Sequence, residues 1–415
     1  MPSRPLAATS IAVVLLLTAC TTAPMVAPSA SPEPSPPAAS GDGVLRLGTL
    51  LPTTGATSFL SAAQAAGVEL AVREINEAGG VLGEPVEVFH RDSADASSSV
   101  VEASYAELVA QGVDVIVGPA SSVLAERILP LAIADGVALI SPSATAPSLS
   151  SLDDDGLLLR TVPSAALQGE ALATLLEEEG AQTVAALTFD DAMSAAVTSA
   201  LSTALGDDAV TVDETFTAEA DVAALVSLVA DAAPDAVVVS SPFAAAATNV
   251  ALLTSLAQAG FGGDSLWLTS GNLADYSREL PPGTLEGVRG VLDGRSPDEG
   301  FAARVRAMDP RVSDLRYAAE AYDAVVLAAL AATVAGDDGG ASVAYRIPGV
   351  SGEGIKCVSF GECLDVLTTR DDIDYDGASG PLALDSSGDP QMAHFRVLLY
   401  GADNRPAPSA DVLVE

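Results

Sequence analysis

Two short segments rich in hydroxyl groups have the residue types that bind a carboxylate. Residues 118–122, Gly-Pro-Ala-Ser-Ser, stand between an apolar run and a helical pattern, and residues 141–147, Ser-Pro-Ser-Ala-Thr-Ala-Pro, follow the next apolar run. A helix N-terminus supplies free N–H groups and a partial positive charge, and serine or threonine beside it adds donors. Plain N-capping by Ser122 is the alternative for the first segment. Because both segments follow neighbouring apolar runs, together they favour an anion site.

Residues with catalytic potential are few. His90 and His394 are the only histidines and lie far apart in the sequence, and it contains neither a Gly-x-Ser-x-Gly turn nor a Gly-x4-Gly-Lys-Ser/Thr phosphate loop. Residues 372–377 copy the start of an EF-hand loop, but Ala383 stands where the bidentate glutamate belongs, so a solvated acidic turn is favoured. We predict that the chain is not an enzyme and uses neither a cofactor nor a metal.

The segments that must position these residues alternate between short apolar runs and helical patterns. This rhythm predicts an α/β fold with mostly parallel sheets. The expected strands are residues 44–51, 86–90, 113–117, 137–140, 184–188, 210–216, 236–239, 266–268 and 287–292. Two consecutive sets of similar size predict two Rossmann-like lobes, and ligands of such sheets bind at the carboxyl ends of the strands.

One long apolar segment, residues 315–334, raises the question of a membrane span. Tyr322 and Asp323 interrupt it and it falls short of the length that a span needs, so we predict a core helix. The chain has 415 residues, of which 49% are hydrophobic, which is enough for two cores.

The N-terminus has the pattern of an export signal. Arg4 precedes an apolar core at residues 11–17, which is too short for a spanning helix of about 20 residues. The sequence Leu-Thr-Ala-Cys ending at Cys20 resembles the lipobox of bacterial lipoproteins, which implies cleavage before Cys20 and acylation of its thiol. An ordinary signal peptide cut elsewhere is the alternative. Residues 1–19 are thus the expected signal peptide, and the Pro-, Ser- and Ala-rich residues 20–42 the expected lipid-anchored tether.

The remaining cysteines and the charge fit an exported protein. Cys357 and Cys363 form an even pair in an oxidising compartment, so we predict a disulfide; a metal pair is disfavoured because the spacing lacks the usual zinc pattern. The formal net charge of −38 repels phosphate backbones and anionic lipid, so no nucleic acid is expected as a partner, and the membrane is contacted through the N-terminal lipid only.

The order of short motifs resembles the branched-chain amino acid and amide class of periplasmic binding proteins, fold type I. The similar segments are residues 48–55, 67–83, 118–119, 141–147, 190–192, 322–324 and 380–382. The resemblance implies two lobes joined by a three-crossover hinge. Lobe 1 is expected to comprise residues 43–161 plus 291–377, and lobe 2 residues 162–290 plus 378–415.

The resemblance also assigns ligand-binding positions in lobe 1. The positions that hold a ligand carboxylate fall on Ser122, Ser143 and Thr145, with Ala144 between the last two, and the aromatic lid position falls on Phe59. All of these except Ala144 match the family in side-chain chemistry.

Lobe 2 departs from the family pattern. Met193 stands where relatives often carry tyrosine, the next aromatic position is Phe243, and Ser270 stands where an acidic residue grips the ligand ammonium. An unpaired buried ammonium is costly, so we predict a preference for ligands without one. The alternative is that another acid substitutes, the candidates being Asp190, Asp191 and Asp275.

These observations predict an extracytoplasmic solute-binding lipoprotein, held at the outer face of the cell membrane by lipidated Cys20. It is expected to be a monomer that captures a small polar solute, an amino acid, an amide or a small carboxylate, and delivers it to the permease and ATPase subunits of an ABC importer. A ligand-sensing receptor of the same fold, not coupled to transport, is the alternative.

Overall fold

The computed structural model describes residues 1, 35–55, 57–206, 208–370 and 372–414. The chain divides into two units, residues 1–36 and 37–415. The expected signal peptide, Cys20 and most of the expected tether lie outside the described residues. All that follows concerns the second unit.

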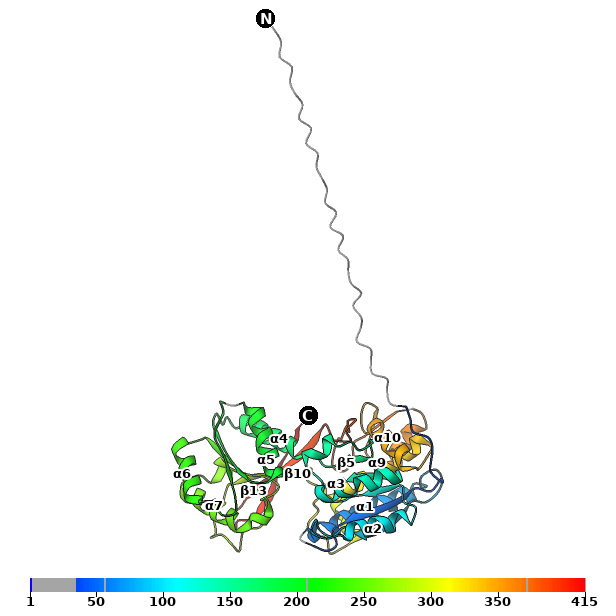
Figure 1. The fold of residues 1–415 in the computed structure, drawn as a ribbon, viewed down its shortest axis with the longest axis horizontal. Helices are drawn as coiled ribbons and strands as arrows, with labels where there is room; N and C mark the ends of the chain where they lie inside the picture. The colour runs from blue at the N-terminus through cyan, green and yellow to red at the C-terminus, as the bar shows by residue number, and fades with distance from the viewer. Residues whose placement is uncertain (2–34, 56, 207, 371, 415) are drawn as a thin grey trace. The chain divides into compact units, whose positions relative to one another are not determined.

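Lobe 1 is built on a five-stranded sheet with the order β2-β1-β3-β4-β5, and all its strand pairs are parallel. The strands are β1 (Arg46–Leu51), β2 (Glu87–Asp92), β3 (Val115–Val117), β4 (Ala138–Ser141) and β5 (Leu158–Arg160). Helices α2 (Val100–Val109) and α3 (Ser122–Asp135) cover one face. The other face packs against α1 (Ser61–Glu77), α8 (Glu299–Met308), α9 (Ala318–Ala335) and α10 (Gly340–Val350). Figure 1 shows this group of helices around the sheet.

Helix α1 turns its periodic apolar side chains to the core, as its spacing predicts. Val68, Ala71, Val72 and Ile75 are all buried there. Gly67 allows α1 to approach α9 closely, because a Cβ at this position would lie 2.2 Å from the carbonyl oxygen of Ala318. The two helices therefore pack backbone against backbone.

Helix α9 is, by length and composition, apolar enough to cross a membrane. Of its apolar window, 83% is buried inside the protein, among the side chains of lobe 1. This is the environment of the core helix that the sequence predicts.

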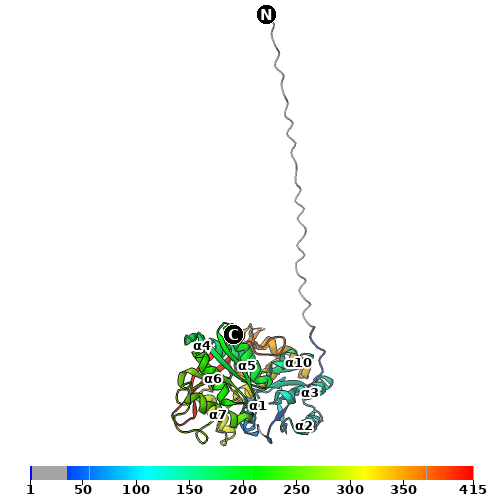
Figure 2. The ribbon, with the colours of Figure 1, turned by 60° about the vertical axis from the view of Figure 1, so that its left-hand side comes forward.

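Lobe 2 contains a seven-stranded sheet with the order β14-β13-β10-β9-β8-β6-β7. Its strands are β6 (Val184–Phe189), β7 (Val210–Phe216), β8 (Ala236–Ser240), β9 (Leu266–Leu268), β10 (Arg289–Asp293), β13 (Ala393–Tyr400) and β14 (Pro406–Val414). The first five strands pair in parallel, whereas β13 and β14 pair antiparallel. Helices α4 (Ala165–Glu178) and α5 (Ala192–Leu205) cover one face, and α6 (Val222–Ala232) and α7 (Ala246–Gln258) the other (Figures 1 and 2). Two mostly parallel α/β lobes are thus confirmed.

The chain passes between the lobes three times, and two of the expected boundaries need correction. Strand β10 belongs to the lobe 2 sheet through Asp293, so the second crossover follows residue 293 and not 290. Leu382 and Leu384 pack in the lobe 1 core, so the third lies after residue 384 and not 377. Strand pairing and core packing, which sequence periodicity does not reveal, decide both positions. We place the crossovers at residues 161–164, 294–298 and 385–392.

Residues 40–43 are held to lobe 1 although the tether is expected to extend to residue 42. The carboxylate of Asp337 accepts from the N–H groups of Ser40 and Gly41, and that of Asp338 from the N–H groups of Asp42 and Gly43, over 2.8–3.3 Å. The end of the tether is therefore residue 39 or earlier.

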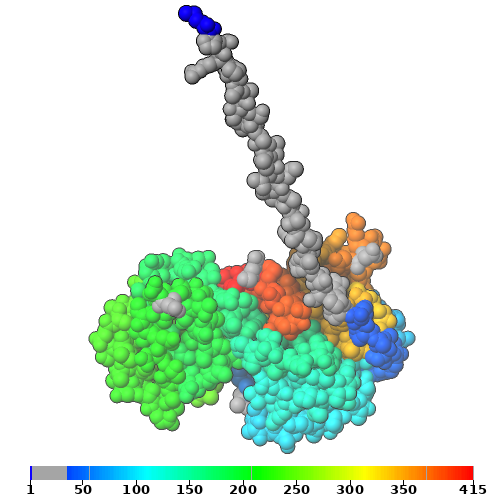
Figure 3. Space-filling model, turned by 45° about the horizontal axis from the view of Figure 1, so that its top comes forward, coloured from blue at the N-terminus to red at the C-terminus, as the bar shows by residue number. Residues whose placement is uncertain are grey.

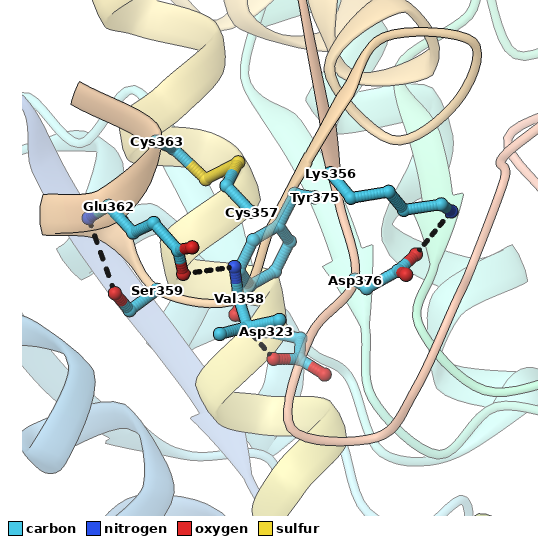
Figure 4. The surroundings of a disulfide bond; sticks show 9 residues. All are labelled: Asp323, Lys356, Cys357, Val358, Ser359, Glu362, Cys363, Tyr375 and Asp376. Carbon is cyan, nitrogen blue, oxygen red and sulfur yellow. Dashed lines mark hydrogen bonds and ion pairs between the residues drawn. A yellow bond between two sulfur atoms is a disulfide. The ribbon is translucent and has the colours of Figure 1, made fainter. Parts of the chain in front are cut away.

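A small unit that contains a disulfide packs against the core of lobe 1 (Figure 4). Strands β11 (Ile355–Cys357) and β12 (Ile373–Tyr375) pair in parallel around α11 (Phe360–Leu367), and a disulfide joins Cys357 to Cys363. Lys356 forms ion pairs with Asp374 and Asp376 at 2.7 and 2.9 Å. Two acids of the EF-hand-like segment therefore bind a lysine within the chain.

Candidate functional site

A cavity of about 460 Å3 lies at the carboxyl ends of the lobe 2 strands and also contacts lobe 1. Lobe 1 contributes Phe59 and Leu60 from the turn before α1, together with Arg316 and Tyr317 from the segment before α9. Lobe 2 contributes residues that follow β6, β8 and β9. Figure 3 shows a hollow between the green surface of lobe 2 and the cyan surface of lobe 1 on one face. The cavity is therefore of the kind in which open α/β sheets bind ligands.

Local hydrogen bonds fix the turn that carries Ser270. The side-chain oxygen of Asn272 accepts from the N–H of Thr269 at 2.9 Å, and its nitrogen donates to the carbonyl of Val239 at 2.8 Å. Asn272 is fully buried. It ties the ends of β8 and β9 together and so holds Ser270 at the cavity wall.

A buried acid stands behind this wall. Asp293, the last residue of β10, is 3% exposed and accepts hydrogen bonds from Gln168 Nε2 at 2.9 Å and from the hydroxyl of Tyr317 at 3.3 Å. Burial raises the pKa of Asp293 to about 6, while the bond from Tyr317, the charge of Arg396 and a bond from Ser270 act to lower it. Gln168, Ser270 and Tyr317 all line the cavity. Two lining residues, Gln168 and Tyr317, thus donate hydrogen bonds to one buried carboxylate.

Arg316 is the cation that lines the cavity among the described residues. Its Nε lies 2.9 Å from Asp314 Oδ2, and its guanidinium carbon lies 5.8 Å from the ring centre of Phe59. A guanidinium at this distance can attract an aromatic face. The pair therefore joins one aromatic and one cationic group at the lobe 1 side of the cavity.

The first hydroxyl segment leads into an open helix end. Ser121 is the N-cap of α3, and its side chain makes no capping hydrogen bond among the described residues. Ser122 Oγ instead accepts from the N–H of Ala146 at 3.1 Å, in the second hydroxyl segment. N-capping by Ser122 is therefore wrong, because its hydroxyl ties the two segments together.

The second hydroxyl segment is held by its neighbours on both sides. Ser143 Oγ accepts from Gln64 Nε2 at 2.9 Å and donates to the carbonyl of Ala120 at 3.2 Å. Thr145 Oγ1 donates to the sulfur of Met193 at 3.4 Å, a contact between the lobes.

Arg160 holds the same segment through hydrogen bonds to its main-chain carbonyls. It is 1% exposed, and its Nη1 donates to the carbonyls of Ala144 and Ala146 at 3.2 and 2.9 Å. Its Nε and Nη2 both bind the carboxylate of Asp389 at 2.6 Å. This buried bidentate pair connects the second hydroxyl segment to the third crossover.

The structure divides the expected ligand-binding residues into two groups. Phe59, Met193, Phe243 and Ser270 line the cavity. Within the described part of the chain, the lining does not include Ser122, Ser143, Ala144 and Thr145; Ala144 is buried, and Thr145 reaches the cavity wall through Met193. The binding role of all eight stays a prediction.

Sequence reasoning missed four residues of this site: Gln168, Asp293, Arg316 and Tyr317. One signal for Asp293 is present, since it ends an apolar strand in the sequence Gly-Val-Leu-Asp. A charged residue at a strand's carboxyl end is a candidate for the ligand crevice. The structure therefore places behind the Ser270 wall a buried acid that sequence reasoning did not consider, and the preference for ligands without an ammonium stays a prediction.

Of the three acids proposed as substitutes, Asp191 and Asp275 line the cavity but already have hydrogen-bond partners, and Asp190 is not among the described lining residues. Asp190 is exposed and not among the described residues that line it. Asp191 caps α5, since its Oδ1 accepts from the N–H groups of Met193 and Ser194 at 2.9 and 3.0 Å. Asp275 accepts from Ser277 and pairs with Arg405 at 3.1 Å, and these partners lower its pKa to about 2.

A separate hollow of about 880 Å3 lies on lobe 1 and is lined partly by Glu69, His90 and Arg311. His90 Nε2 lies 2.7 Å from Glu69 Oε1, and His90 Nδ1 lies 2.9 Å from Thr49 Oγ1. Both ring nitrogens therefore have partners within lobe 1.

Known proteins share this sequence pattern and architecture. The family model for periplasmic binding proteins matches residues 44–394. The chemotactic signal transduction system substrate-binding protein BasB of Halobacterium salinarum is 28% identical over 375 residues, which cover 84% of this chain and 85% of BasB. The leucine-, isoleucine-, valine-, threonine- and alanine-binding protein of Pseudomonas aeruginosa is 33% identical over 128 residues, which cover 31% of this chain and 34% of that protein.

Solved structures show the same fold. The branched-chain amino acid transporter substrate-binding protein LivJ of Streptococcus pneumoniae, in complex with isoleucine, matches with a TM-score of 0.66 and 21% identity over 89% of this chain and 99% of LivJ. A branched-chain amino acid ABC transporter periplasmic ligand-binding protein of Burkholderia xenovorans matches with a TM-score of 0.70 and 17% identity, over 89% and 95%.

Two α/β lobes, three crossovers and a polar cavity at the strand ends define a two-lobed solute-binding protein of fold type I. The matched residues 44–394 extend over both lobes, and the chain belongs to the periplasmic binding protein family. Members of this family are solute-binding proteins, which agrees with the predicted class.

Proposed function

We propose that this protein captures a small polar solute, an amino acid, an amide or a small carboxylate, in the cavity between its lobes and delivers it to the permease and ATPase of an ABC importer. The observation that carries the proposal is the cavity of about 460 Å3, lined from both lobes at the strand ends and bordered by polar and aromatic side chains. Pockets of this size and lining suit small ligands. The protein acts as a monomer.

In this proposal lobe 1 binds the carboxylate of the solute. Ser122, Ser143 and Thr145, which are not among the described lining residues and meet the solute when the lobes close on it, supply hydroxyl groups. The open N-terminus of α3 supplies N–H groups and a partial positive charge. Phe59, whose side chain is exposed and already borders the cavity, covers the apolar part of the solute. On closure, Thr145 and Met193 lie at the line where the two lobes meet.

A thermal-shift screen tests the proposal. The purified protein is heated with amino acids, amides, urea, small carboxylates and aromatic acids. A ligand at about 100 times its Kd stabilises the folded protein by about 2.7 kcal/mol, which moves the melting temperature upward. The Thr145→Ala variant serves as the matched control and is expected to show a smaller shift with the same compound. If no compound raises the melting temperature, capture of these solutes is wrong.

Membership of the periplasmic binding protein family suggests an extracytoplasmic location. We propose in addition that lipidated Cys20 attaches the protein to the membrane. The Cys20→Ser protein should leave the membrane fraction, and wild-type protein should carry the mass of acyl chains. If the Cys20→Ser protein stays in the membrane fraction and the wild type carries no acyl mass, the proposal is wrong.

We also propose that the bond between Cys357 and Cys363 forms in the exported protein. A short loop closed in this way stabilises by about 2 kcal/mol on entropic grounds. Thiol titration of the denatured, unreduced protein is expected to find neither sulfur reactive. Two free thiols contradict the bond.

A second candidate function is ligand sensing without transport. The favouring observation is that BasB, which matches 84% of this chain, is named for a chemotactic signal transduction system. Uptake of a labelled ligand by cells with and without this protein separates the two. Lost uptake supports the importer, whereas normal uptake with a lost behavioural or transcriptional response to the same ligand supports sensing.

A further inference from the structure

The charged side chains on the cavity wall differ in how far their charge is already satisfied. Among the described residues, Asp191, Asp275 and Arg316 line the cavity. Asp191 accepts hydrogen bonds from two main-chain N–H groups at the start of α5, where the helix also carries a partial positive charge. Asp275 pairs with Arg405 at 3.1 Å. Both acids therefore have partners within lobe 2, and the question is what Arg316 binds.

Arg316 is held in position by its own segment, which connects α8 to α9. Asp314 Oδ1 accepts from the main-chain N–H of Arg316 at 3.0 Å, and Asp314 Oδ2 lies 2.9 Å from its Nε. On another side, the guanidinium carbon lies 5.8 Å from the ring centre of Phe59. These contacts position the guanidinium before a solute arrives, which lowers the entropic cost of binding to it.

The terminal nitrogens of Arg316 keep their hydrogen-bond donors. No hydrogen bond from its Nη1 or Nη2 is found among the described residues, and these two atoms carry most of the N–H groups of an arginine. The ion pair with Asp314 is open to solvent, with side chains that are 31% and 43% exposed, so it competes only weakly. A guanidinium with free terminal nitrogens suits a carboxylate, which it binds through two parallel hydrogen bonds.

The net charge of −38 does not exclude an anionic solute. Exposed charges that lie farther away than the Debye length of about 8 Å are largely screened at physiological ionic strength, whereas a partner inside the cavity is screened much less. The local balance therefore decides, and it consists of two acids that have partners and one cation with open donors.

We propose that Arg316 binds a second carboxylate of the solute, so that the protein selects compounds with two carboxylates, dicarboxylates and acidic amino acids, over analogues with one. The proposal rests on the proposed capture of a solute in this cavity and adds the chemical class of that solute. One carboxylate binds the hydroxyl segments of lobe 1, and the other binds Arg316. Phe59, which is 54% exposed and lies beside the guanidinium, covers the carbon atoms between them.

Matched pairs of compounds that differ in one carboxylate test the proposal by calorimetry. The pairs are glutarate against pentanoate, terephthalate against benzoate, and glutamate against glutamine, its neutral isostere. The wild type is expected to bind the compound with two carboxylates at least about tenfold more tightly, the value of one hydrogen bond between charged groups. Arg316→Gln should reduce this preference to about threefold or less, because a neutral amide keeps a hydrogen bond but no charge.

Arg311→Gln is the matched control. Arg311 has the same Asp-x-Arg spacing in the same segment, and its Nη2 lies 2.8 Å from Asp309 Oδ2, but it is not among the described residues that line the cavity. The variant removes the same charge and should keep the preference of the wild type. Arg316→Lys keeps the charge without the planar fork, so its preference should lie between those of the wild type and Arg316→Gln.

Three outcomes overturn the role of Arg316 and leave solute capture standing. The first is equal or tighter binding of the single carboxylates by the wild type. The second is a preference that survives in Arg316→Gln, because both members of a pair then weaken equally and Arg316 holds the carboxylate that they share. The third is an equal loss of preference in Arg311→Gln, which assigns the effect to the charge of the whole segment. Failure of every compound, in these pairs and in the thermal-shift screen, overturns solute capture itself and the inference with it.

Discussion

The two walls of the cleft differ in hydrogen-bonding character although one α/β architecture builds both. In lobe 1 the side chain of Ser121, at the start of α3, makes no capping bond among the described residues, so N–H donors are open. In lobe 2, the carboxylate of Asp191 caps the start of α5, and the buried carboxylate of Asp293 accepts a hydrogen bond from Gln168. The polarity of a strand-end site is therefore decided by what occupies the first helical turn and what lies behind the wall.

Replacing Arg160, which supports the lobe 1 wall, should have the largest effect on the stability of the protein. Arg160→Ala leaves the Asp389 carboxylate without its buried bidentate partner and removes the donors to the second hydroxyl segment. We expect the free energy of unfolding to fall by about 3–5 kcal/mol, measured by chemical denaturation. A loss below about 1 kcal/mol would show that the pair is not needed.

The double variant Arg160→Met with Asp389→Leu is the control for the charge. Removing both partners leaves no unpaired buried charge, so most of the stability should return. Ligand affinity should stay weak, because the carbonyls of Ala144 and Ala146 still lack their donor. Recovery of both properties would mean that Arg160 does not organise the lobe 1 wall.

Removing one donor from the lobe 1 wall should weaken binding without unfolding the protein. Thr145→Ala is expected to raise the Kd of a carboxylate ligand about tenfold to a hundredfold, or about 1.5–3 kcal/mol. Ser148→Ala, in the exposed continuation of the same segment, removes a hydroxyl that bonds to Glu126 and should leave the Kd unchanged. Calorimetry that finds the two variants alike would remove Thr145 from the site.

The buried acids between the walls predict a dependence of stability on pH. Burial raises the pKa of Glu320 to about 7 from 4.5 and that of Asp293 to about 6 from 3.8. Both raised values mean that the folded state favours the protonated acids. The contribution of these two acids to the free energy of unfolding is fully present below their unfolded pKa values. It is lost as the pH rises through about 6 for Asp293 and about 7 for Glu320.

Glu320→Gln isolates this effect. The variant should be more stable than the wild type by about 1–2 kcal/mol near pH 8 and show no such gain near pH 4, because only the charged form of Glu320 is disfavoured. Thermal unfolding at both values measures the difference. An equal shift at the two pH values would indicate a packing effect instead of a titration.

The sequence predicts the lobes and the hydroxyl segments because both depend on local patterns. Apolar runs alternating with helical periods give the strands, and the serines and threonines directly follow two of them. The buried groups escape prediction because they meet across long distances: Gln168 and Asp293 are 125 residues apart, and Arg160 and Asp389 are 229 apart. Strand order, which places β10 beside β9, brings Asp293 to Ser270. No local pattern in the sequence specifies that neighbour.

The smallest effects on binding should come from the two exposed phenylalanine side chains that line the cavity, one from each lobe. Phe59 and Phe243 are 54% and 65% exposed, so Phe59→Ala and Phe243→Ala should leave stability nearly unchanged. Each loses only the apolar area that a bound solute covers, and we expect about 1 kcal/mol, or about a fivefold higher Kd, for each. Because the side chains belong to opposite lobes, the double variant should lose the sum of the two. Val358→Ala, which removes a 63% exposed apolar side chain beside the disulfide, should leave the Kd unchanged. If the double variant binds no more weakly than Phe59→Ala, lobe 2 contributes only its polar wall, and the apolar part of the solute rests on lobe 1.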